Sequence, residues 1–120
     1  MGNSIGSKVN NDQIVKETTN YPVVVYSKPN CGYCKMAKNL LNEEKVLFKE
    51  HDLDLVSATN PDGYQAYVNG LVYTTRITTV PQIFICGKFI GGYTELYGLR
   101  EAGNLIKAID ECAYQYDPVI

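Results

Sequence analysis

Two cysteines separated by two residues, Cys31 and Cys34, are the side chains in this sequence best placed to do chemistry. Such a pair is typical either of half a zinc site or of a dithiol that exchanges electrons with other disulfides. A zinc site would need Cys86, Cys112 or His51 to converge on the pair from distant positions in the chain. Because those residues are isolated from one another in the sequence, we interpret the pair as a redox dithiol and predict no structural metal.

The position of the pair assigns different roles to its two thiols. The β-rich run Val23–Tyr26 predicts a strand buried on both faces, and helical periodicity begins at Cys31. The dipole and the unpaired N–H groups at a helix start lower the pKa of a thiol, and Lys28 adds a positive charge nearby. We therefore expect Cys31 to be the attacking thiolate. Cys34 lies one turn further into the helix, so we expect it to be the more buried, resolving thiol.

The elements that must position the dithiol follow from the apolar pattern. The first elements are a helix capped at Asn10–Asp12 that ends near Thr19, the strand Val23–Tyr26, and a helix from Cys31 to Lys45. Next come a strand over Val46–Asp54, with Leu53 and Leu55 leading into a loop, and a helix from Asn60-Pro61 to Asn69-Gly70. The last elements are a hairpin over Gln82–Ile90 and two short helices up to Ala113. Strand–helix–strand requires two parallel strands, whereas the hairpin is antiparallel. The predicted fold class is α/β, with a mixed four-stranded sheet flanked by helices on both faces.

Length and composition limit the kinds of protein this chain can be. Its 120 residues, 45% of them hydrophobic, suffice for one small domain. We expect an N-terminal extension over 1–20, the domain over 21–114 and a tail over 115–120. A net charge of -2 favours neither nucleic-acid binding nor an anionic membrane surface. No apolar run approaches the roughly 20 residues of a membrane helix, so no stable membrane association is expected.

The first 20 residues are polar and contain no Arg, which fits neither a secretory signal nor a transit peptide. Four cysteines without such a signal indicate a reducing compartment, and we predict a cytoplasmic location. Gly2 is a possible acyl acceptor, but the myristoylation pattern wants Ser or Thr at the position where Gly6 stands.

Two further motifs carry a family resemblance. Thr79-Val80-Pro81 directly precedes a predicted strand, and together with the dithiol it resembles the thioredoxin superfamily, in which that proline is cis and faces the dithiol. Within the superfamily the chain resembles glutaredoxins, which carry C-[PSG]-Y-C, then T-V-P, then G-G followed two residues later by an acidic residue. Here Gly91-Gly92 and Glu95 match the last motif. Thioredoxins usually carry W-C-G-P-C, and this chain contains no Trp.

The resemblance runs from about residue 23 to residue 109 and implies a thioredoxin-like fold with a groove for glutathione. Lys28 would pair with the glycine carboxylate, and the Val80 backbone would bind the cysteinyl portion. The helix start after Gly92 would meet the γ-glutamyl carboxylate, with Thr94 adding its N–H and hydroxyl, and Glu95 would accept from the γ-glutamyl amino group. The full set that the resemblance assigns to glutathione is Lys28, Tyr33, Gln65, Thr79, Val80, Pro81, Gly92, Tyr93, Thr94 and Glu95.

The sequence departs from the family pattern in two places. Glu95 stands where Asp is usual, which adds one methylene to the expected contact. The stretch from Gly70 to Thr79 is a few residues longer than in the family, which displaces Gln65 and separates Arg76 from Thr-Val-Pro. We interpret Arg76 as a solvent-exposed residue.

The activity implied is that of a dithiol glutaredoxin. Cys31 attacks the glutathione sulfur of a protein–glutathione mixed disulfide, and a second glutathione resolves the intermediate. In the dithiol route Cys34 attacks instead, which gives a redox-active Cys31–Cys34 disulfide. The implied partners are glutathione and proteins that are glutathionylated or contain disulfides. The electrons come from glutathione, and no dinucleotide fingerprint predicts binding of NADPH.

Other functions stay open at this point. Some glutaredoxins without Pro after the first Cys hold a [2Fe–2S] cluster between two protomers with two glutathiones, and Gly32 qualifies this chain, with Cys31 as the protein ligand. We expect a monomer, or a dimer only if cluster-bound. A thioredoxin-like reductant and an interaction module with an incidental dithiol are the alternatives. His51 is predicted to be an ordinary surface residue, Cys86 to be buried in a strand, and Cys112 to be an inert thiol rather than a glutathionylated or intermolecularly bonded one.

Overall fold

The computed structural model describes residues 8–113. The expectations for Gly2 and for the tail 115–120 lie outside these residues. The helices are α2 (Asn11–Thr18), α3 (Gly32–Glu43), α4 (Leu53–Thr59), α5 (Tyr64–Thr75), α6 (Tyr93–Glu101) and α7 (Leu105–Ala113), and the strands are β1 (Val23–Ser27), β2 (Lys49–Asp52), β3 (Gln82–Ile85) and β4 (Lys88–Gly91). The strands form one four-stranded sheet in the order β2-β1-β3-β4. β1 pairs with β2 in parallel and with β3 antiparallel, and β3 and β4 form the hairpin. This confirms the predicted fold class.

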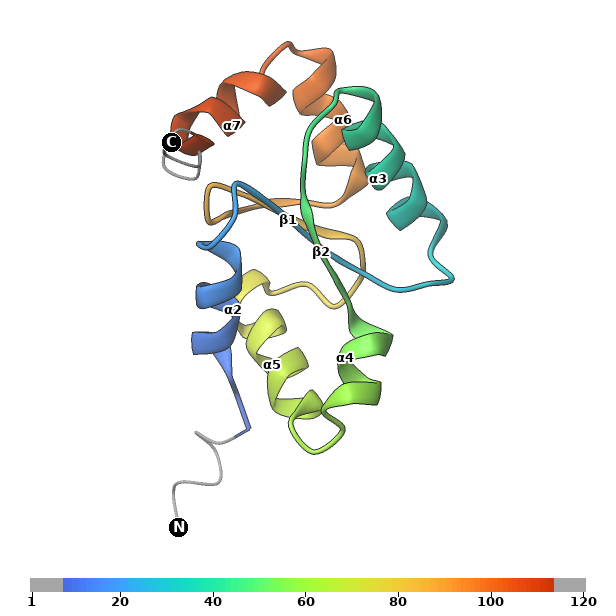
Figure 1. Cartoon of the computed structure of the whole chain (residues 1–120), viewed down its shortest axis with the longest axis vertical. Coiled ribbons are helices and arrows are strands. Elements are labelled where there is room, and N and C mark those ends of the chain that lie inside the picture. The colour runs from blue at the N-terminus through green and yellow to red at the C-terminus, as the bar shows by residue number, and fades with distance from the viewer. Residues whose placement is uncertain (1–7, 114–120) are drawn as a thin grey trace, which may run out of the picture.

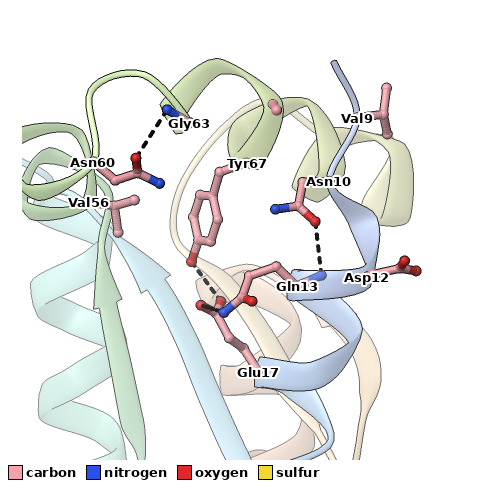
Figure 2. A pocket seen from close by; sticks show the side chains of 10 residues that line it. Val9, Asn10, Asp12, Gln13, Glu17, Val56, Asn60, Gly63 and Tyr67 are labelled. Atoms are coloured by element: carbon pink, nitrogen blue, oxygen red, sulfur yellow. Dashed lines mark hydrogen bonds between the residues drawn. The ribbon is translucent and has the colours of Figure 1, made fainter. Parts of the chain in front are cut away.

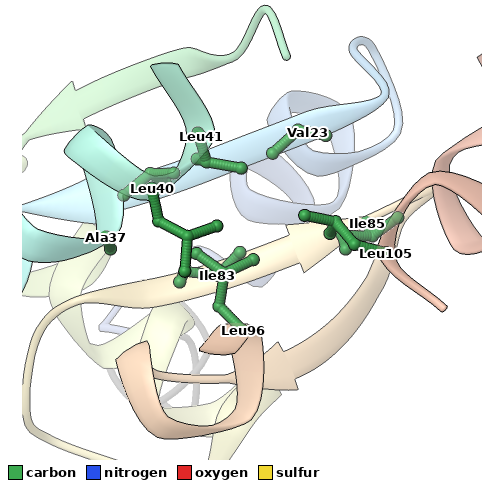
Figure 3. Close-up of a cluster of buried hydrophobic side chains, with 9 residues drawn as sticks. Val23, Ala37, Leu40, Leu41, Ile83, Ile85, Leu96 and Leu105 are labelled. Carbon is green, nitrogen blue, oxygen red and sulfur yellow. The ribbon is translucent and has the colours of Figure 1, made fainter. Parts of the chain in front are cut away.

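The sheet separates two layers of helices, with α3, α6 and α7 on one side and α2, α4 and α5 on the other (Figure 1). Strand β1 is buried along its whole length, as its continuous apolar run predicts. Val23 and Val25 point into the core under α3, α6 and α7, and Figure 3 shows the side chains of that core. Val24 and Tyr26 point into the core on the opposite side. A strand whose alternate residues are both covered in this way holds the loop before Cys31 in a fixed place.

The segment after β2 forms a helix where the sequence predicted a loop. The side chain of Asp52 accepts the N–H groups of Asp54 and Leu55 at 2.9 and 3.3 Å, which caps α4 directly at the end of the strand. The predicted helix start at Asn60 was also wrong. Asn60 ends α4, and its side chain accepts the Gly63 N–H at 3.2 Å, so that α5 begins only at Tyr64.

Gly70 lies inside α5 and does not end it. A Cβ atom at this position would overlap the backbone of Asn10, and the Asn10 N–H donates to the Ala66 carbonyl oxygen at 2.8 Å. This glycine therefore permits the chain entering α2 to pack against the middle of α5. A glycine that serves a close approach between helices looks in the sequence like one that ends a helix.

No helix among residues 8–113 is both long and apolar enough to cross a membrane.

Candidate active site

Cys31 is the N-cap of α3. Its Sγ accepts the N–H of Cys34 at 3.0 Å and lies 3.6 Å from the carbonyl oxygen of Val80. A disulfide joins Cys31 to Cys34. Cys34 is fully buried, whereas Cys31 is half-buried, so the sulfur at the helix start is the one that a substrate reaches. A backbone N–H aimed at that sulfur stabilises a thiolate there.

The Val80–Pro81 peptide bond is cis, as the resemblance implied. The loop before it is held from below by the buried side chain of Gln82, whose amide donates to the carbonyl oxygens of Ile77 and Thr79 at 2.8 and 3.0 Å. Residues that precede β3 are thereby fixed beside the dithiol, with the Val80 carbonyl oxygen against Cys31 Sγ.

The start of α6 is the second segment that borders the site, beside the loop that contains the cis proline. Gly91 adopts a φ of 122°, which favours glycine, and the Gly92 N–H donates to the Glu95 carboxylate at 2.8 Å. A Cβ atom on Gly92 would lie 3.3 Å from the Pro81 carbonyl oxygen. The helix start therefore packs closely against the cis proline. The carboxylate of Glu95 already caps its own helix in this arrangement.

A groove of about 420 Å³ lies between the cis-proline loop and the start of α6. Eight of the residues that the resemblance assigned to glutathione line it, namely Tyr33, Thr79, Val80, Pro81, Gly92, Tyr93, Thr94 and Glu95. Ile77 and Phe89 also line the groove, and sequence reasoning missed both. Phe89 stands two residues before Gly91 on β4, so strand alternation was an available signal for it. Ile77 had no such signal, because its place depends on the loop held by Gln82.

The two remaining candidates, Lys28 and Gln65, do not line the groove, and neither does Arg76. Lys28 is exposed in the loop between β1 and Cys31, and it is not among the residues that line the groove. Gln65 is exposed on α5, where its amide donates to the Asn69 side chain at 2.9 Å. Arg76 ends α5 with a φ of 64° and places its guanidinium 4.9 Å from the ring centre of Tyr73, exposed as predicted.

A larger cavity, of about 700 Å³, lies among α2, α4 and α5, away from the dithiol (Figure 2). Glu17 lines it, and its carboxylate accepts from the hydroxyls of Tyr26 and Tyr67 at 2.8 and 2.7 Å and from Gln13 at 3.0 Å. These donors satisfy the carboxylate and attach α2 to the sheet and to α5. Because no cysteine lines this cavity, the smaller groove beside the dithiol is the candidate active site.

His51 contacts Tyr26 and Glu17, so it is not the ordinary surface residue that the sequence predicted. Its ring stacks on that of Tyr26 with 5.2 Å between the ring centres, and its Nε2 atom lies 3.8 Å from Oε1 of Glu17. Its side chain is only 17% exposed. Burial lowers the pKa of His51, and the nearby Glu17 carboxylate opposes that shift. Parallel pairing of Tyr26 with His51 in the sheet explains the contact, which the sequence order hides.

Cys86 and Cys112 form a second disulfide, so the predictions for both residues were wrong. Cys86 is the first residue of the two-residue turn between β3 and β4, with a φ of 53°, and Gly87 follows with a φ of 80°. Cys112 lies on α7, which folds back over this turn. No cysteine in the described part of the chain is left free. The described residues also contain no group of three His, Cys, Asp or Glu side chains arranged to hold a metal ion.

The glutaredoxin family model matches residues 23–90, which include the dithiol, the cis proline and the hairpin. The chain belongs to the glutaredoxin family. It is 37% identical over 118 residues to the mitochondrial glutaredoxin-2 of Bos taurus, a match that covers 93% of this chain and 72% of the relative. It is 40% identical over 98 residues to glutaredoxin-2 of Schizosaccharomyces pombe, covering 82% and 84%.

Solved glutaredoxin structures share the fold. The buckwheat glutaredoxin–glutathione complex matches with a TM-score of 0.75 and 29% identity, over 86% of this chain and 89% of that one. The holo form of glutaredoxin C1 from Populus tremula x tremuloides matches with a TM-score of 0.74 and 33% identity, over 84% and 95%. These matches confirm the resemblance and the thioredoxin-like fold that it implied.

Proposed function

We propose that this glutaredoxin is a glutathione-dependent thiol–disulfide oxidoreductase that reduces protein–glutathione mixed disulfides and protein disulfides through the thiolate of Cys31. The observation that carries the proposal is the position of the Cys31 sulfur. It lies at a helix start, receives the Cys34 N–H at 3.0 Å, and borders the groove at the Val80 carbonyl oxygen. Membership of the glutaredoxin family supports glutathione as the electron donor, as does the glutathione complex of the buckwheat relative.

The chemistry is two successive thiol–disulfide exchanges. The Cys31 thiolate attacks the glutathione sulfur of the mixed disulfide, the substrate S–S bond breaks, and the substrate protein leaves as a thiolate that takes a proton from solvent. The thiolate of a second glutathione then attacks the glutathione sulfur bound to Cys31, which releases glutathione disulfide and restores the Cys31 thiolate. In the dithiol route the Cys34 thiolate attacks the Cys31 sulfur, so the bond from Cys31 to glutathione breaks, glutathione leaves as a thiolate, and the Cys31–Cys34 disulfide forms. Two glutathiones then reduce this disulfide by the same exchange and leave as glutathione disulfide.

We assign each residue a role from the chemical group that it offers to glutathione. The extended backbone at Val80 pairs with the cysteinyl part of glutathione, and the N–H groups at the start of α6 meet the γ-glutamyl carboxylate. The Glu95 carboxylate receives the γ-glutamyl amino group while it also holds the Gly92 N–H. Lys28 lies three residues before Cys31 on an exposed loop, and we assign its ammonium group to the glycine carboxylate of glutathione.

A kinetic comparison of reducing thiols tests the proposal. The protein is assayed with the mixed disulfide of glutathione and 2-mercaptoethanol, with either glutathione or N-acetylcysteine as the reducing thiol. We expect saturable turnover with glutathione and a rate at least about 10-fold lower with N-acetylcysteine, which lacks the two carboxylate-bearing ends that the groove binds. Equal rates with the two thiols would reject glutathione-specific recognition and favour the thioredoxin-like alternative.

A cluster-binding form is a second candidate, and one observation favours it. A Cβ atom at Gly32 would meet nothing within 4 Å, so the helix start beside Cys31 is open. Because Cys34 is fully buried, Cys31 is the ligand that each chain would supply to a [2Fe–2S] cluster, with glutathione and a second protomer completing the set. Anaerobic purification followed by an absorption spectrum tests this, and a colourless monomer without charge-transfer bands rejects it.

The cellular location and the domain limits stay predictions. We propose a cytoplasmic protein, and the mitochondrial name of the bovine relative makes the mitochondrion the alternative. Fractionation of cells that express the natural chain distinguishes the two. We also propose the limits 1–20, 21–114 and 115–120, and the family model at 23–90 falls inside the central segment.

A further inference from the structure

Three tyrosine rings continue from the groove along the boundary between α3 and α6, which pack side by side (Figure 1). The ring centre of Tyr93 lies 6.1 Å from that of Tyr33 and 6.0 Å from that of Tyr97. Tyr93 and Tyr97 stand four residues apart on α6 and therefore share one face of that helix. Tyr33 is 62% exposed and Tyr97 is 42% exposed, so the row presents aromatic surface to solvent.

A second hollow, of about 220 Å³, adjoins this row. It is lined by Met36, Asn39 and Leu40 of α3, by Tyr93 and by Glu43 and Arg100. Tyr93 lines both this hollow and the glutathione groove. The two depressions are therefore parts of one continuous surface, and the ring of Tyr93 stands between them.

The far end of the hollow carries more negative than positive charge. Arg100 is surrounded by three carboxylates, with Glu43 at 3.1 Å, Glu101 at 3.3 Å and Glu44 at 4.0 Å. One guanidinium neutralises one carboxylate, so this end of the surface favours a cationic side chain. The surface thus runs from aromatic rings near Cys31 to an acidic end near Arg100.

We propose that the row of Tyr33, Tyr93 and Tyr97 and the adjoining hollow bind the polypeptide part of a glutathionylated protein. The segment that fits carries an apolar side chain for the aromatic row and a basic side chain for the acidic end. This inference rests on the proposed function. The groove accommodates the glutathione moiety, and the row begins at Tyr33, two residues after the sulfur to which the mixed disulfide comes. A polypeptide joined to glutathione at that sulfur therefore meets the surface first at Tyr33.

The test compares two kinds of substrate in the variant Tyr97→Ala. One substrate is a short peptide with a single glutathionylated cysteine flanked by leucine and lysine, and the other is the mixed disulfide of glutathione and 2-mercaptoethanol. Because Tyr97 does not line the groove, the small disulfide should react at the wild-type rate. We expect kcat/KM for the peptide to fall about 3- to 10-fold, mainly through KM, as an aromatic contact is lost. Tyr97→Phe keeps the ring and should restore the wild-type value.

Tyr73→Ala is the matched control. Tyr73 is also an exposed tyrosine, 52% exposed, and Arg76 lies over its ring at 4.9 Å just as Arg100 lies over Tyr97 at 5.3 Å. Tyr73→Ala should leave kcat/KM unchanged for both substrates. An equal loss on both substrates in Tyr97→Ala, or no loss on the peptide, would overturn the inference while the proposed function stands. Failure of the wild-type protein to turn over either disulfide would overturn the proposed function and this inference with it.

Discussion

The molecule contains two disulfides that differ in the length of chain they close and in the backbone groups that face their sulfurs. Cys31 and Cys34 are three residues apart, and the Cys31 sulfur is half-buried at a helix start, where it accepts a backbone N–H. Cys86 and Cys112 are 26 residues apart and join the β3–β4 turn to α7. The Cys86 sulfur faces the carbonyl oxygens of Ala108 and Ile109 at 3.3 and 3.6 Å.

These surroundings suit the two pairs to different tasks. An N–H group directed at a sulfur stabilises a thiolate, whereas carbonyl oxygens destabilise one. The Cys31 sulfur receives the Cys34 N–H at 3.0 Å beside one carbonyl oxygen at 3.6 Å, while the Cys86 sulfur faces two carbonyl oxygens. A disulfide that closes a loop of 26 residues lowers the conformational entropy of the unfolded chain far more than a disulfide that closes a loop of 3 residues. We therefore assign exchange chemistry to the pair at the start of α3 and conformational stability to the pair that holds α7.

The largest effect should come from the attacking sulfur. Cys31→Ser removes the nucleophile, and we expect kcat/KM for glutathionylated substrate to fall at least about 1000-fold. The midpoint of urea unfolding in the presence of reductant should stay at the wild-type value, since the side chains differ little in size. Activity within a few-fold of wild type would show that another sulfur carries the reaction.

The second pair should show the opposite result. We expect the double variant Cys86→Ala/Cys112→Ala to lose about 3 kcal/mol of unfolding free energy, because the unfolded chain regains the entropy that the long cross-link removes. Urea denaturation without reductant measures this loss, and kcat/KM at 25 °C should remain close to wild type. A large loss of activity at an unchanged midpoint would contradict the division of tasks.

Graded reduction should separate the pairs in time. With dithiothreitol under native conditions, we expect the Cys31–Cys34 disulfide to open about 10-fold faster than the Cys86–Cys112 disulfide, because the Cys34 N–H at the helix start stabilises the thiolate that leaves from Cys31, whereas the Cys86 sulfur faces two carbonyl oxygens. Alkylation at successive times followed by peptide mass analysis identifies the thiols that are released. The reverse order would show that α7 opens more readily than the packing of its buried residues implies.

The smallest effect should distinguish the two sulfurs of one pair. In Cys34→Ser a second glutathione still resolves the intermediate on Cys31, so turnover of the glutathione–2-mercaptoethanol disulfide should change by less than about threefold. Reduction of an intramolecular protein disulfide should be lost, since that route needs Cys34. A variant inactive toward both substrates would rule out resolution by glutathione.

Much of the fold was predictable because its signals are local. The apolar run at β1, the start of α3 at Cys31, the hairpin around Gly87 and the break between α6 and α7 each depend on neighbouring residues. The errors lie where a distant segment decides the outcome. Gly70 continues α5 because the chain at Asn10 packs against it. His51 is half-buried because it pairs with Tyr26 across the sheet.

The same division holds for the candidate site and for the two cysteine pairs. The sequence by itself determined the order of the dithiol, Thr79-Val80-Pro81 and Gly91-Gly92, and it assigned the attacking role to Cys31, since a helix start is a local feature. Only the tertiary structure placed Ile77 in the groove and left Gln65 outside it. It also joined Cys86 to Cys112, because no spacing in the chain reveals that α7 folds back over the β3–β4 turn.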